Sequence, residues 1–390
     1  MSQRTIVVGD LHLVRDTPPR VVADAVRLVT DHPGARLVFL GDLFDLSADH
    51  PGEARGTALR EAVETHAAFA RALGEHVERG GELWVVGGNH DAAAGDPAER
   101  GALLGGLRLD GERRARVRTS PWFIHEAGLH LEHGHLFDPD NATAHPLVAG
   151  ARSLGVRFVE EFIAPTGAFR YLNANDKTPL WLLASAFRWY GVRGPYVVYK
   201  YFDTAFRALA ASGPGFDARA AADRALGAER EAAFGLAHGL DAARTRALAG
   251  ACAVPTLADR GRTFQRLYLD RVGATVALLS GAAAVAAGNR SAGLSLLGAG
   301  AIAMGVSWAL GFDRYGGSVP ELLARGAEAV ADATGAELVV MGHAHREALT
   351  GRYANTGSFS FPRDAPGRPF LEIERAASGP RAIRRHLLAS

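Results

Sequence analysis

The chain has 390 residues, enough for two or three domains or for one domain with a large insertion. Its 43 basic and 42 acidic residues leave a formal net charge of +1, without the basic excess of most nucleic-acid-binding proteins, so no nucleic-acid partner is expected. A hydrophobic fraction of 48% excludes a disordered chain. The single cysteine excludes an intrachain disulfide and a cysteine-rich metal site, and the first residues predict no secretory signal.

The first part of the chain alternates short apolar runs with longer segments of helical periodicity. The runs Thr5–Val8, Arg36–Leu40 and Leu83–Val86 predict strands, and each ends in a glycine-containing turn. The segments Pro19–Thr30 and Thr57–Glu78 predict helices. Because a strand–helix–strand order produces a mostly parallel sheet with helices on its faces, we expect an α/β fold.

A hairpin and a long helical region are predicted next. Trp122–His125 and Leu129–His133 form the expected hairpin, with its turn at Glu126–Gly128. Residues 147–332 show few strand patterns and predict a large α-helical insertion. Strand patterns return in the last part of the chain, at Glu337–Met341, Arg352–Ala354 and Phe370–Ile373. We therefore expect residues 1–146 and 333–390 to form one α/β domain that the insertion interrupts.

Five short motifs rich in Asp, His and Asn follow predicted strands. They are Gly9-Asp10-Leu11-His12, Gly41-Asp42-Leu43-Phe44-Asp45, Gly87-Gly88-Asn89-His90-Asp91, His133-Gly134-His135 and Gly342-His343-Ala344-His345. Ligands of α/β sheets bind at the carboxyl ends of the strands, so these side chains are expected to converge on one site. Carboxylates, an amide oxygen and imidazoles together suit Mn²⁺, Fe or Zn²⁺ better than Ca²⁺ or Mg²⁺.

The motifs offer too many ligands for one ion. Two ions ~3.5–4 Å apart would clamp a phosphoryl group and lower the pKa of a bridging water. A carboxylate between the two ions would offset their mutual repulsion. The sequence therefore predicts a dinuclear site, with two divalent ions as cofactors and Mn²⁺ as the expected metal ahead of Fe or Zn²⁺.

The order GDxH, GDxxD, GNHD, HGH and GHxH resembles the motif series of the calcineurin-like metallophosphoesterase superfamily. The stretch Asn355–Phe359 is also similar to the Asn-Thr-Gly-Ser-aromatic segment of that family. The resemblance covers the α/β part of the chain and not the insertion. It implies layered sheets flanked by helices, and a hydrolase that acts on phosphoester or phosphoanhydride bonds.

Carried onto this sequence, the resemblance implies a role for each motif residue. Seven would bind metal: Asp10, His12 and His345 at the first ion, Asp42 between both ions, and Asn89, His133 and His343 at the second. His90 would hydrogen-bond the phosphate and protonate the leaving oxygen, with Asp91 orienting its ring. The first histidine of HGH is the expected ligand, so His135 is expected to lie behind the ligands. Asp45 is expected either to support a ligand or to cap a helix.

The insertion contains two uncharged stretches, Val272–Gly288 and Ser291–Phe312, each within the ~17–25 residues of a membrane-spanning helix. Small residues such as Gly281 and Gly305 suit close helix packing in lipid, and the arginines before residue 272 would place that side in the cytoplasm. We expect a membrane hairpin over residues 272–312. The alternatives are a buried helical hairpin and a hydrophobic lid that holds an acyl chain. Lys177 and Lys200 are candidate contacts for substrate phosphates.

These features predict a membrane-attached metallophosphoesterase on the cytoplasmic side that hydrolyses a lipid-linked or nucleotide-lipid phosphate. The UDP-2,3-diacylglucosamine hydrolases of lipid A synthesis are distantly similar, because they also insert helices that hold acyl chains. They usually carry arginine after the metal-binding asparagine, where this chain has His90. Two other readings stay open: a phosphodiesterase or protein phosphatase with a soluble substrate, and a catalytically silent membrane scaffold.

Overall fold

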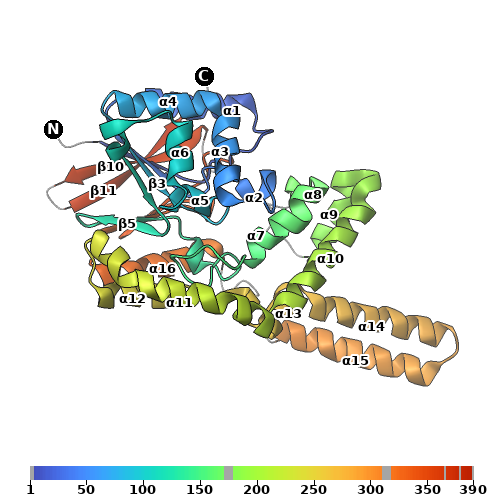
Figure 1. Cartoon of the computed structure of the whole chain (residues 1–390). Coiled ribbons are helices and arrows are strands. Elements are labelled where there is room, and N and C mark those ends of the chain that lie inside the picture. Colours follow the sequence, from blue (N-terminus) through green and yellow to red (C-terminus); the bar gives the residue numbers. More distant parts are fainter. Residues whose placement is uncertain (1–3, 171–178, 310–317, 364–365, 377–378, 389–390) are drawn as a thin grey trace. The chain divides into compact units, whose positions relative to one another are not determined.

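The computed structural model describes residues 4–170, 179–309, 318–363, 366–376 and 379–388 (Figure 1). The chain separates into two compact units. The first unit comprises Met1–Phe169, Arg219–Pro255 and Pro320–Ser390, and the second comprises Arg170–Ala218 and Thr256–Val319. All the metal-ligand candidates lie in the first unit.

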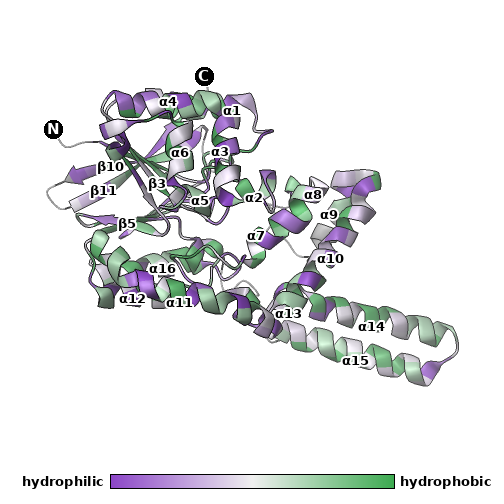
Figure 2. Ribbon diagram, in the orientation of Figure 1, coloured by the Kyte–Doolittle hydropathy of each residue, from purple (hydrophilic) through white to green (hydrophobic). Residues whose placement is uncertain are grey.

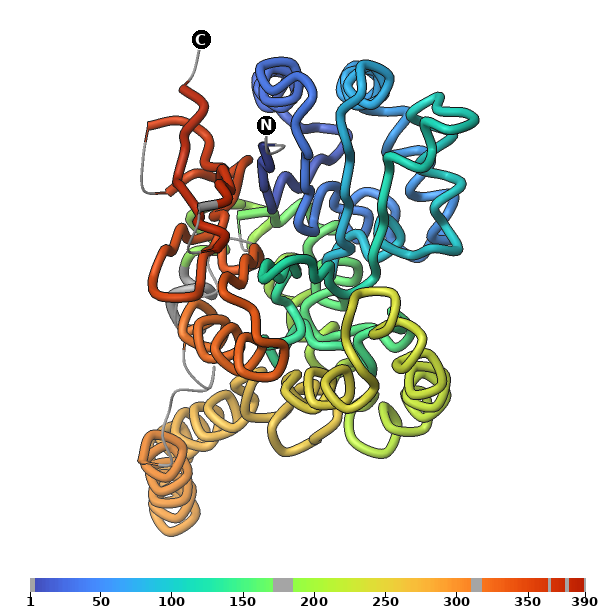
Figure 3. Tube along the Cα trace, turned by 90° about the vertical axis from the view of Figure 1, so that its left-hand side faces the viewer, coloured from blue at the N-terminus to red at the C-terminus, as the bar shows by residue number. Residues whose placement is uncertain are grey.

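The first sheet has six strands in the order β11-β10-β1-β2-β3-β4. Their bounds are β1 Thr5–Val8, β2 Arg36–Leu40, β3 Glu82–Val86, β4 Val117–Ser120, β10 Arg368–Ala376 and β11 Gly379–Leu387. Strands β1 to β3 are parallel, as the alternating pattern predicted, and β4 extends the parallel set; β10 pairs antiparallel with β1 and with β11. Figure 3 shows the red C-terminal strands beside the blue N-terminal one, which brings the two ends of the sequence into one sheet.

The second sheet has five strands in the order β5-β6-β7-β9-β8. Their bounds are β5 Phe123–Glu126, β6 Leu129–Glu132, β7 Leu338–Met341, β8 Glu347–Thr350 and β9 Tyr353–Thr356. The predicted hairpin is confirmed as β5 and β6, whose turn uses positive φ angles at Ala127 and Gly128. Strand β6 pairs parallel with β7, more than 200 residues later, so residues on both sides of the helical region share this sheet.

Apolar side chains fill the space between the two sheets. Val38 and Val86 of the first sheet pack in one cluster with Leu131 and Val340 of the second. The opposite face of the first sheet packs against helices, and Phe39 lies edge-on to Phe69 there. These helices are α1 Pro19–Thr30, α2 Leu46–Asp49, α3 Arg55–Thr65, α4 Ala67–Glu78, α5 Ala92–Gly95 and α6 Arg100–Gly106. The apolar runs therefore predicted strands correctly, because the central strands are covered on both faces.

Two features of this half differ from the sequence prediction. The predicted helix Thr57–Glu78 is wrong as a single element, because His66 adopts a non-helical backbone and ends α3 before α4 begins. The His66 ring stacks on Phe44 with a centroid distance of 6.1 Å, a tertiary contact that local periodicity does not reveal. Strands β4, β8 and β11 were not predicted; all three lie at sheet edges, where polar side chains interrupt the apolar pattern.

The described residues of 147–332 contain helices and no named strand, as predicted for the insertion, but the helices divide between the two units. In the first unit these are α7 Leu154–Phe158, α8 Ala164–Thr166, most of α11 Pro214–Ala237, α12 Ala242–Ala251 and most of α16 Val319–Thr334. Phe123 of β5 and Trp122, which precedes this strand, contact Phe234 of α11, with ring centroids 5.0 and 5.9 Å apart, respectively. Helices therefore cover the outer face of the second sheet as well (Figure 1).

The second unit is helical and contains a long apolar hairpin. Its helices are α9 Pro179–Tyr190, α10 Gly194–Ala211, α13 Arg260–Arg266, α14 Leu269–Ala286 and α15 Arg290–Ala309. Helices α14 and α15 pack so closely that only glycine fits at position 281. A Cβ atom there would lie 2.8 Å from the Gly293 carbonyl oxygen. Both have the length and composition of membrane-crossing helices, and Figure 2 shows them mostly in the colours of apolar residues.

Buried histidines behind the second sheet make stability depend on pH. Burial and the neighbouring Arg118 lower the pKa of His238 to about 3, so the folded protein keeps this ring neutral where the unfolded chain protonates it. Below about pH 6.5 the unfolded state binds more protons, and stability falls as the pH falls. We expect a loss on the order of 1 kcal/mol between about pH 6.5 and 5, measured by denaturant unfolding.

The His238→Gln variant should lose the part of this pH dependence that His238 contributes, because it removes that titrating ring, while His125, whose pKa is lowered to about 4, keeps its own part. The control is His32→Gln. His32 lies just after the C-terminal end of α1, away from the histidines behind the second sheet, so this variant should leave the pH dependence of stability unchanged. Equal slopes in the wild type and the His238 variant would contradict the prediction.

Candidate metal centre

The five motifs meet at the carboxyl ends of the strands they follow. Asp10, Asp42 and Asn89 come after β1, β2 and β3 of the first sheet, whereas His133 and His343 come after β6 and β7 of the second. The loops are joined directly, because the Gly342 N–H donates to the His133 carbonyl and the Asp10 N–H donates to the Gly41 carbonyl. Residues separated by more than 330 positions in the sequence thus form one site, as the strand positions predicted.

The first group of ligand candidates is Asp10, His12 and His345, whose ligand atoms lie within 4.8 Å of one another. The Nε2 atoms of His12 and His345 are 3.0 Å apart. The Asp10 Oδ1 atom lies 3.2 Å from His345 Nε2 and 3.8 Å from His12 Nε2. Two imidazole nitrogens and a buried carboxylate oxygen therefore point at one place, an arrangement that suits a shared cation.

The second group is Asp42, His133 and His343, with the Asn89 side chain beside it. His133 Nδ1 donates to the Leu40 carbonyl at 2.8 Å, which leaves the Nε2 lone pair of a neutral ring facing the site. Nε2 lies 3.1 Å from Asp42 Oδ2 and 3.1 Å from Asn89 Oδ1, and neither oxygen can donate. Three acceptors converge, so a positive charge belongs between them.

A proton supplies that charge when no metal does. Burial lowers the pKa of His133, but the Asp42 carboxylate raises it to about 9. The same field attracts a divalent cation, and the oxygen and nitrogen donors fit one. Divalent ions held by the two groups would supply charge that polarises phosphoryl oxygens and acidifies water. Asp42 is the carboxylate in position to serve both groups, because its Oδ2 also lies 3.7 Å from His12 Nε2.

The backbone of the ligand loops is strained. Positive φ angles occur at five of the candidate ligands: Asp10 (55°), His12 (43°), Asp42 (51°), His343 (62°) and His345 (52°). Each such conformation costs on the order of 1–3 kcal/mol and persists only where the surroundings enforce it. The Asn355–Phe359 stretch helps to enforce it, because Asn355 Nδ2 donates to the Gly342 carbonyl and Ser358 Oγ to the Asp10 carbonyl.

The structure assigns the orientation of His90 to a different carboxylate from the one predicted. We expected Asp91 to orient the ring, but the Asp91 carboxylate accepts the backbone N–H groups of Asp42, Leu43, Phe44 and Gly88 and so holds the loop after β2. His90 Nδ1 lies 2.8 Å from Asp45 Oδ1. The sequence-based role of Asp91 is therefore wrong, because local adjacency does not show where a side chain turns.

Asp45 performs both of the functions that the sequence left open. Its Oδ1 atom caps α2 by accepting the Ala48 N–H at 3.0 Å, and its Oδ2 atom lies 3.6 Å from Nδ1 of the candidate ligand His12. The Oδ1 atom also contacts His90. Ser47 Oγ completes a triangle, 2.9 Å from Asp45 Oδ1 and 2.7 Å from His90 Nδ1. Burial lowers the pKa of His90, but the Asp45 and Asp42 carboxylates raise it to about 10, so the ring carries a proton at neutral pH.

Asp138 is a site residue that the sequence analysis missed. Its Oδ2 atom lies 3.0 Å from Nε2 of the candidate ligand His343 and so orients that ring. Oδ2 also accepts from Asn141 Nδ2 at 2.8 Å, and Asn141 Oδ1 accepts from Asn89 Nδ2 at 3.2 Å. This chain of contacts turns Asn89 Oδ1 toward His133. The only signal in the sequence is the position of Asp138 three residues after the HGH motif.

The remaining predicted residues take other positions. His135 is buried beside the ligands, its ring centroid 5.3 Å from that of His133, and the group of ligand atoms contains His133 rather than His135. Burial lowers the pKa of His135 well below its usual range, so the ring is neutral. Lys200 lies on α10 and donates to Asp203 at 2.9 Å. Lys177 lies outside the described residues.

Comparison with known proteins identifies the family. A sequence model of the calcineurin-like phosphoesterases matches residues 3–201. This chain is a calcineurin-like phosphoesterase. It is therefore a hydrolase that acts on phosphoester bonds, and the Asp/His groups at its strand ends are able to bind metal. A search of curated proteins found no match to the chain.

The contacts of Asp138 predict a selective metal defect. Asp138→Asn should weaken binding of the ion held by Asn89 and His343 by about 10–100-fold, the usual effect of losing a partner behind a ligand, and spare the other ion. Asp42→Ala should instead lose both ions, because its carboxylate faces both groups. Elemental analysis during titration with a chelator measures the two affinities.

Asp16→Asn is the control, because Asp16 is exposed and lies outside the site. Two ions bound to Asp138→Asn with wild-type affinity would show that Asp138 does not position the ligands.

Proposed function

We propose that this phosphoesterase is a dinuclear Mn²⁺-dependent enzyme, with Fe or Zn²⁺ as alternatives, that is attached to the membrane and hydrolyses a lipid-linked phosphate or pyrophosphate. The observation that carries the proposal is the presence in one chain of a convergent set of metal ligands and an exposed apolar hairpin. The family membership supports the phosphoester chemistry. The attachment and the lipid substrate rest on the hairpin.

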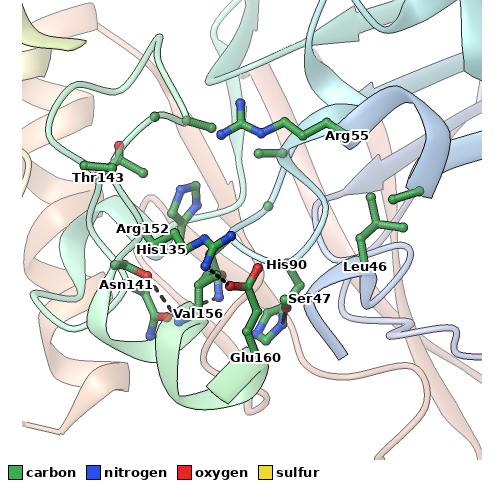
Figure 4. Close-up of a pocket in the computed structure, with 18 of the residues that line it drawn as sticks. Leu46, Ser47, Arg55, His90, His135, Asn141, Thr143, Arg152, Val156 and Glu160 are labelled. Atoms are coloured by element: carbon green, nitrogen blue, oxygen red, sulfur yellow. Dashed lines mark hydrogen bonds and ion pairs between the residues drawn. The ribbon is translucent and has the colours of Figure 1, made fainter. Parts of the chain in front are cut away.

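The side chains divide the chemistry between binding and proton transfer. Asp10, His12 and His345 would hold one ion, Asn89, His133 and His343 the other, and Asp42 both. Protonated His90 is positioned to donate to the leaving oxygen, because Asp45 and Ser47 fix its Nδ1 side. His90, Asn89 and Ser47 also line the neighbouring pocket, where the rest of the substrate would lie (Figure 4).

The hairpin supports membrane attachment through its exposed side chains. Leu279 is 67% exposed, Ile302 69% and Trp308 66%, and only 17% of each helix window is buried. Large apolar side chains with no protein cover indicate contact with lipid or with another apolar surface. Within the second unit this exposure favours the membrane hairpin over the buried hairpin, which needs neighbouring helices around it.

The base of the hairpin is polar and suits the membrane surface. Ser307 Oγ donates to Asp270 Oδ2 at 2.7 Å, and Arg271 Nε donates to Ser307 Oγ at 3.2 Å. The Arg271 guanidinium lies 4.7 Å from the Trp308 ring centroid, so a cation and an amphipathic ring stand together where the apolar stretch ends. Arginines 260, 262 and 266 precede it on α13. By the excess of basic residues we place this end on the cytoplasmic side.

The substrate class includes that of the UDP-2,3-diacylglucosamine hydrolases, to which the sequence has a distant likeness. His90 stands where those enzymes usually carry arginine. A histidine that carries a proton adds general-acid function at that place. A soluble phosphodiester remains the competing substrate, and activity on lipid pyrophosphates compared with bis-p-nitrophenyl phosphate distinguishes the two.

The role of His90 predicts a leaving-group effect. His90→Ala should keep both metals and the fold, because the resemblance gives His90 no ligand role even though its ring lies within reach of His12 and Asp42, yet it should lose about 10²–10⁴-fold in rate on alkyl phosphate esters. The loss should be smaller on p-nitrophenyl esters, whose leaving group needs no proton. Steady-state rates and metal content of the purified variant measure both. Equal losses for both leaving groups would contradict the general-acid role.

The exposed face of the hairpin predicts how attachment can be removed. The double variant Leu279→Glu with Ile302→Glu should no longer float with liposomes in a flotation assay. It should keep its activity on a soluble chromogenic ester. Leu236→Glu is the matched control, because Leu236 is 77% exposed on α11, outside the hairpin. Wild-type protein that stays soluble without detergent and fails to float would overturn membrane attachment.

A further inference from the structure

The pocket beside the metal centre carries charged side chains that the chemistry above does not use. It has a volume of about 280 Å³, and its walls come from α2, the loop before α3 and the chain between Asn141 and Glu160 (Figure 4). Asn89 and His90 line it, so it opens directly onto the reacting groups. A substrate with its scissile phosphorus at the metal centre would extend into this space.

Arg55 is the unpaired cation of the pocket. It stands at the first position of α3, is exposed, and within the described part of the chain forms no hydrogen bond or ion pair. Figure 4 shows its side chain extending from α3 over the pocket. Burial raises the pKa of Glu160, and Arg55 lowers it from a distance. No carboxylate among the described residues holds Arg55 in an ion pair, so its N–H groups are available to an anionic group of the substrate.

Arg152 contributes a second guanidinium on the opposite wall. Its Nη1 atom lies 2.8 Å from Glu160 Oε2, and its side chain is 47% exposed. Glu160 fixes the direction of the arginine and leaves the other N–H groups of the planar head available. The ion pair therefore holds Arg152 in place, while the Glu160 carboxylate partly neutralises its charge.

The other acidic side chain of the pocket is already engaged. Glu53 lies 3.3 Å from His50 Nδ1, on the side where Glu61 also contacts that ring at 3.5 Å. Of the two arginines that line the pocket, Arg55 is therefore the one that no described carboxylate holds in an ion pair. Phosphate suits such a position, because arginine binds its oxygens with two parallel N–H groups.

We infer that Arg55, assisted by Arg152, binds a second phosphate group of the substrate, so that the preferred substrates are pyrophosphate esters rather than compounds with one phosphate. The inference rests on the proposed function, because it places the scissile phosphorus at the metal centre. In the reaction, water adds its oxygen to that phosphorus and the bond to the bridging oxygen breaks. The water oxygen and one of its protons become a hydroxyl group on the attacked phosphorus. The other proton goes to the oxygen of the leaving phosphate, so two phosphomonoesters form.

The test compares two substrates on the Mn²⁺-loaded full-length protein. UDP-glucose carries two phosphates, and the p-nitrophenyl ester of uridine 5′-monophosphate carries one. Arg55→Gln should lower kcat/KM for UDP-glucose about 10–100-fold, the effect of one charge-assisted hydrogen bond, and change the single-phosphate ester less than about twofold. Arg152→Gln should act in the same direction and less strongly.

Arg60→Gln is the matched control, because Arg60 lies on the same helix, is exposed and does not line the pocket. It should leave both substrates unchanged. Equal losses on both substrates in Arg55→Gln, or no loss on either, would overturn the second phosphate site.

A binding measurement separates this inference from the proposed function. Calorimetry with methylenediphosphonate and methylphosphonate, in excess Mn²⁺, should show tighter binding of the diphosphonate that Arg55→Gln abolishes. If this holds while neither ester is hydrolysed, the phosphate site stands and the proposed hydrolysis fails. If both esters are hydrolysed and Arg55→Gln binds both phosphonates like the wild type, the hydrolysis stands and the phosphate site fails.

Discussion

The buried carboxylate of Asp42 carries a negative charge that the metal centre must compensate. Its side chain is 1% exposed, and burial alone raises its pKa, but His133 and His90 lower that pKa well below the usual range. The group therefore stays ionised in the interior, where an uncompensated charge is very costly. The imidazoles around it, and the cations that the acceptor geometry calls for, compensate this charge. Removing that compensation would leave the interior of the first unit unstable.

The layered fold holds the ligands in a geometry that isolated loops would not adopt. Two sheets share one apolar core, so the strand ends of both are rigid neighbours. The strained backbone at the ligands is held by contacts from elsewhere in the chain: the Asp91 carboxylate on the loop after β2, and Ser358 on the Asp10 carbonyl. Orientation comes from a further layer, in which Asp45 fixes His90 and Asp138 fixes His343. The strained backbone thus lowers the stability of the fold, and in return the ligand side chains are held in fixed positions.

The two units use apolar residues in opposite ways. The first unit buries them between sheets and helices. The second unit displays them on α14 and α15, whose contact with each other depends on glycines such as Gly281 and Gly300. Under the proposal that the hairpin enters a bilayer, its environment is lipid, and the exposed side chains are stable there. The enzyme would then meet its substrate where the acyl chains already lie.

The sequence by itself determined the parallel strands β1 to β3, the β5–β6 hairpin, the family and the convergence of the five motifs. These follow from local apolar runs and from the rule that strand ends share one edge. Tertiary structure alone decided the break at His66, the edge strands, and the partners of His90 and His343. The reason is physical: a side chain's partner depends on which segments the fold brings beside it. Asp91 is adjacent to His90 in the chain, yet Asp45, from another strand end, is adjacent to it in space.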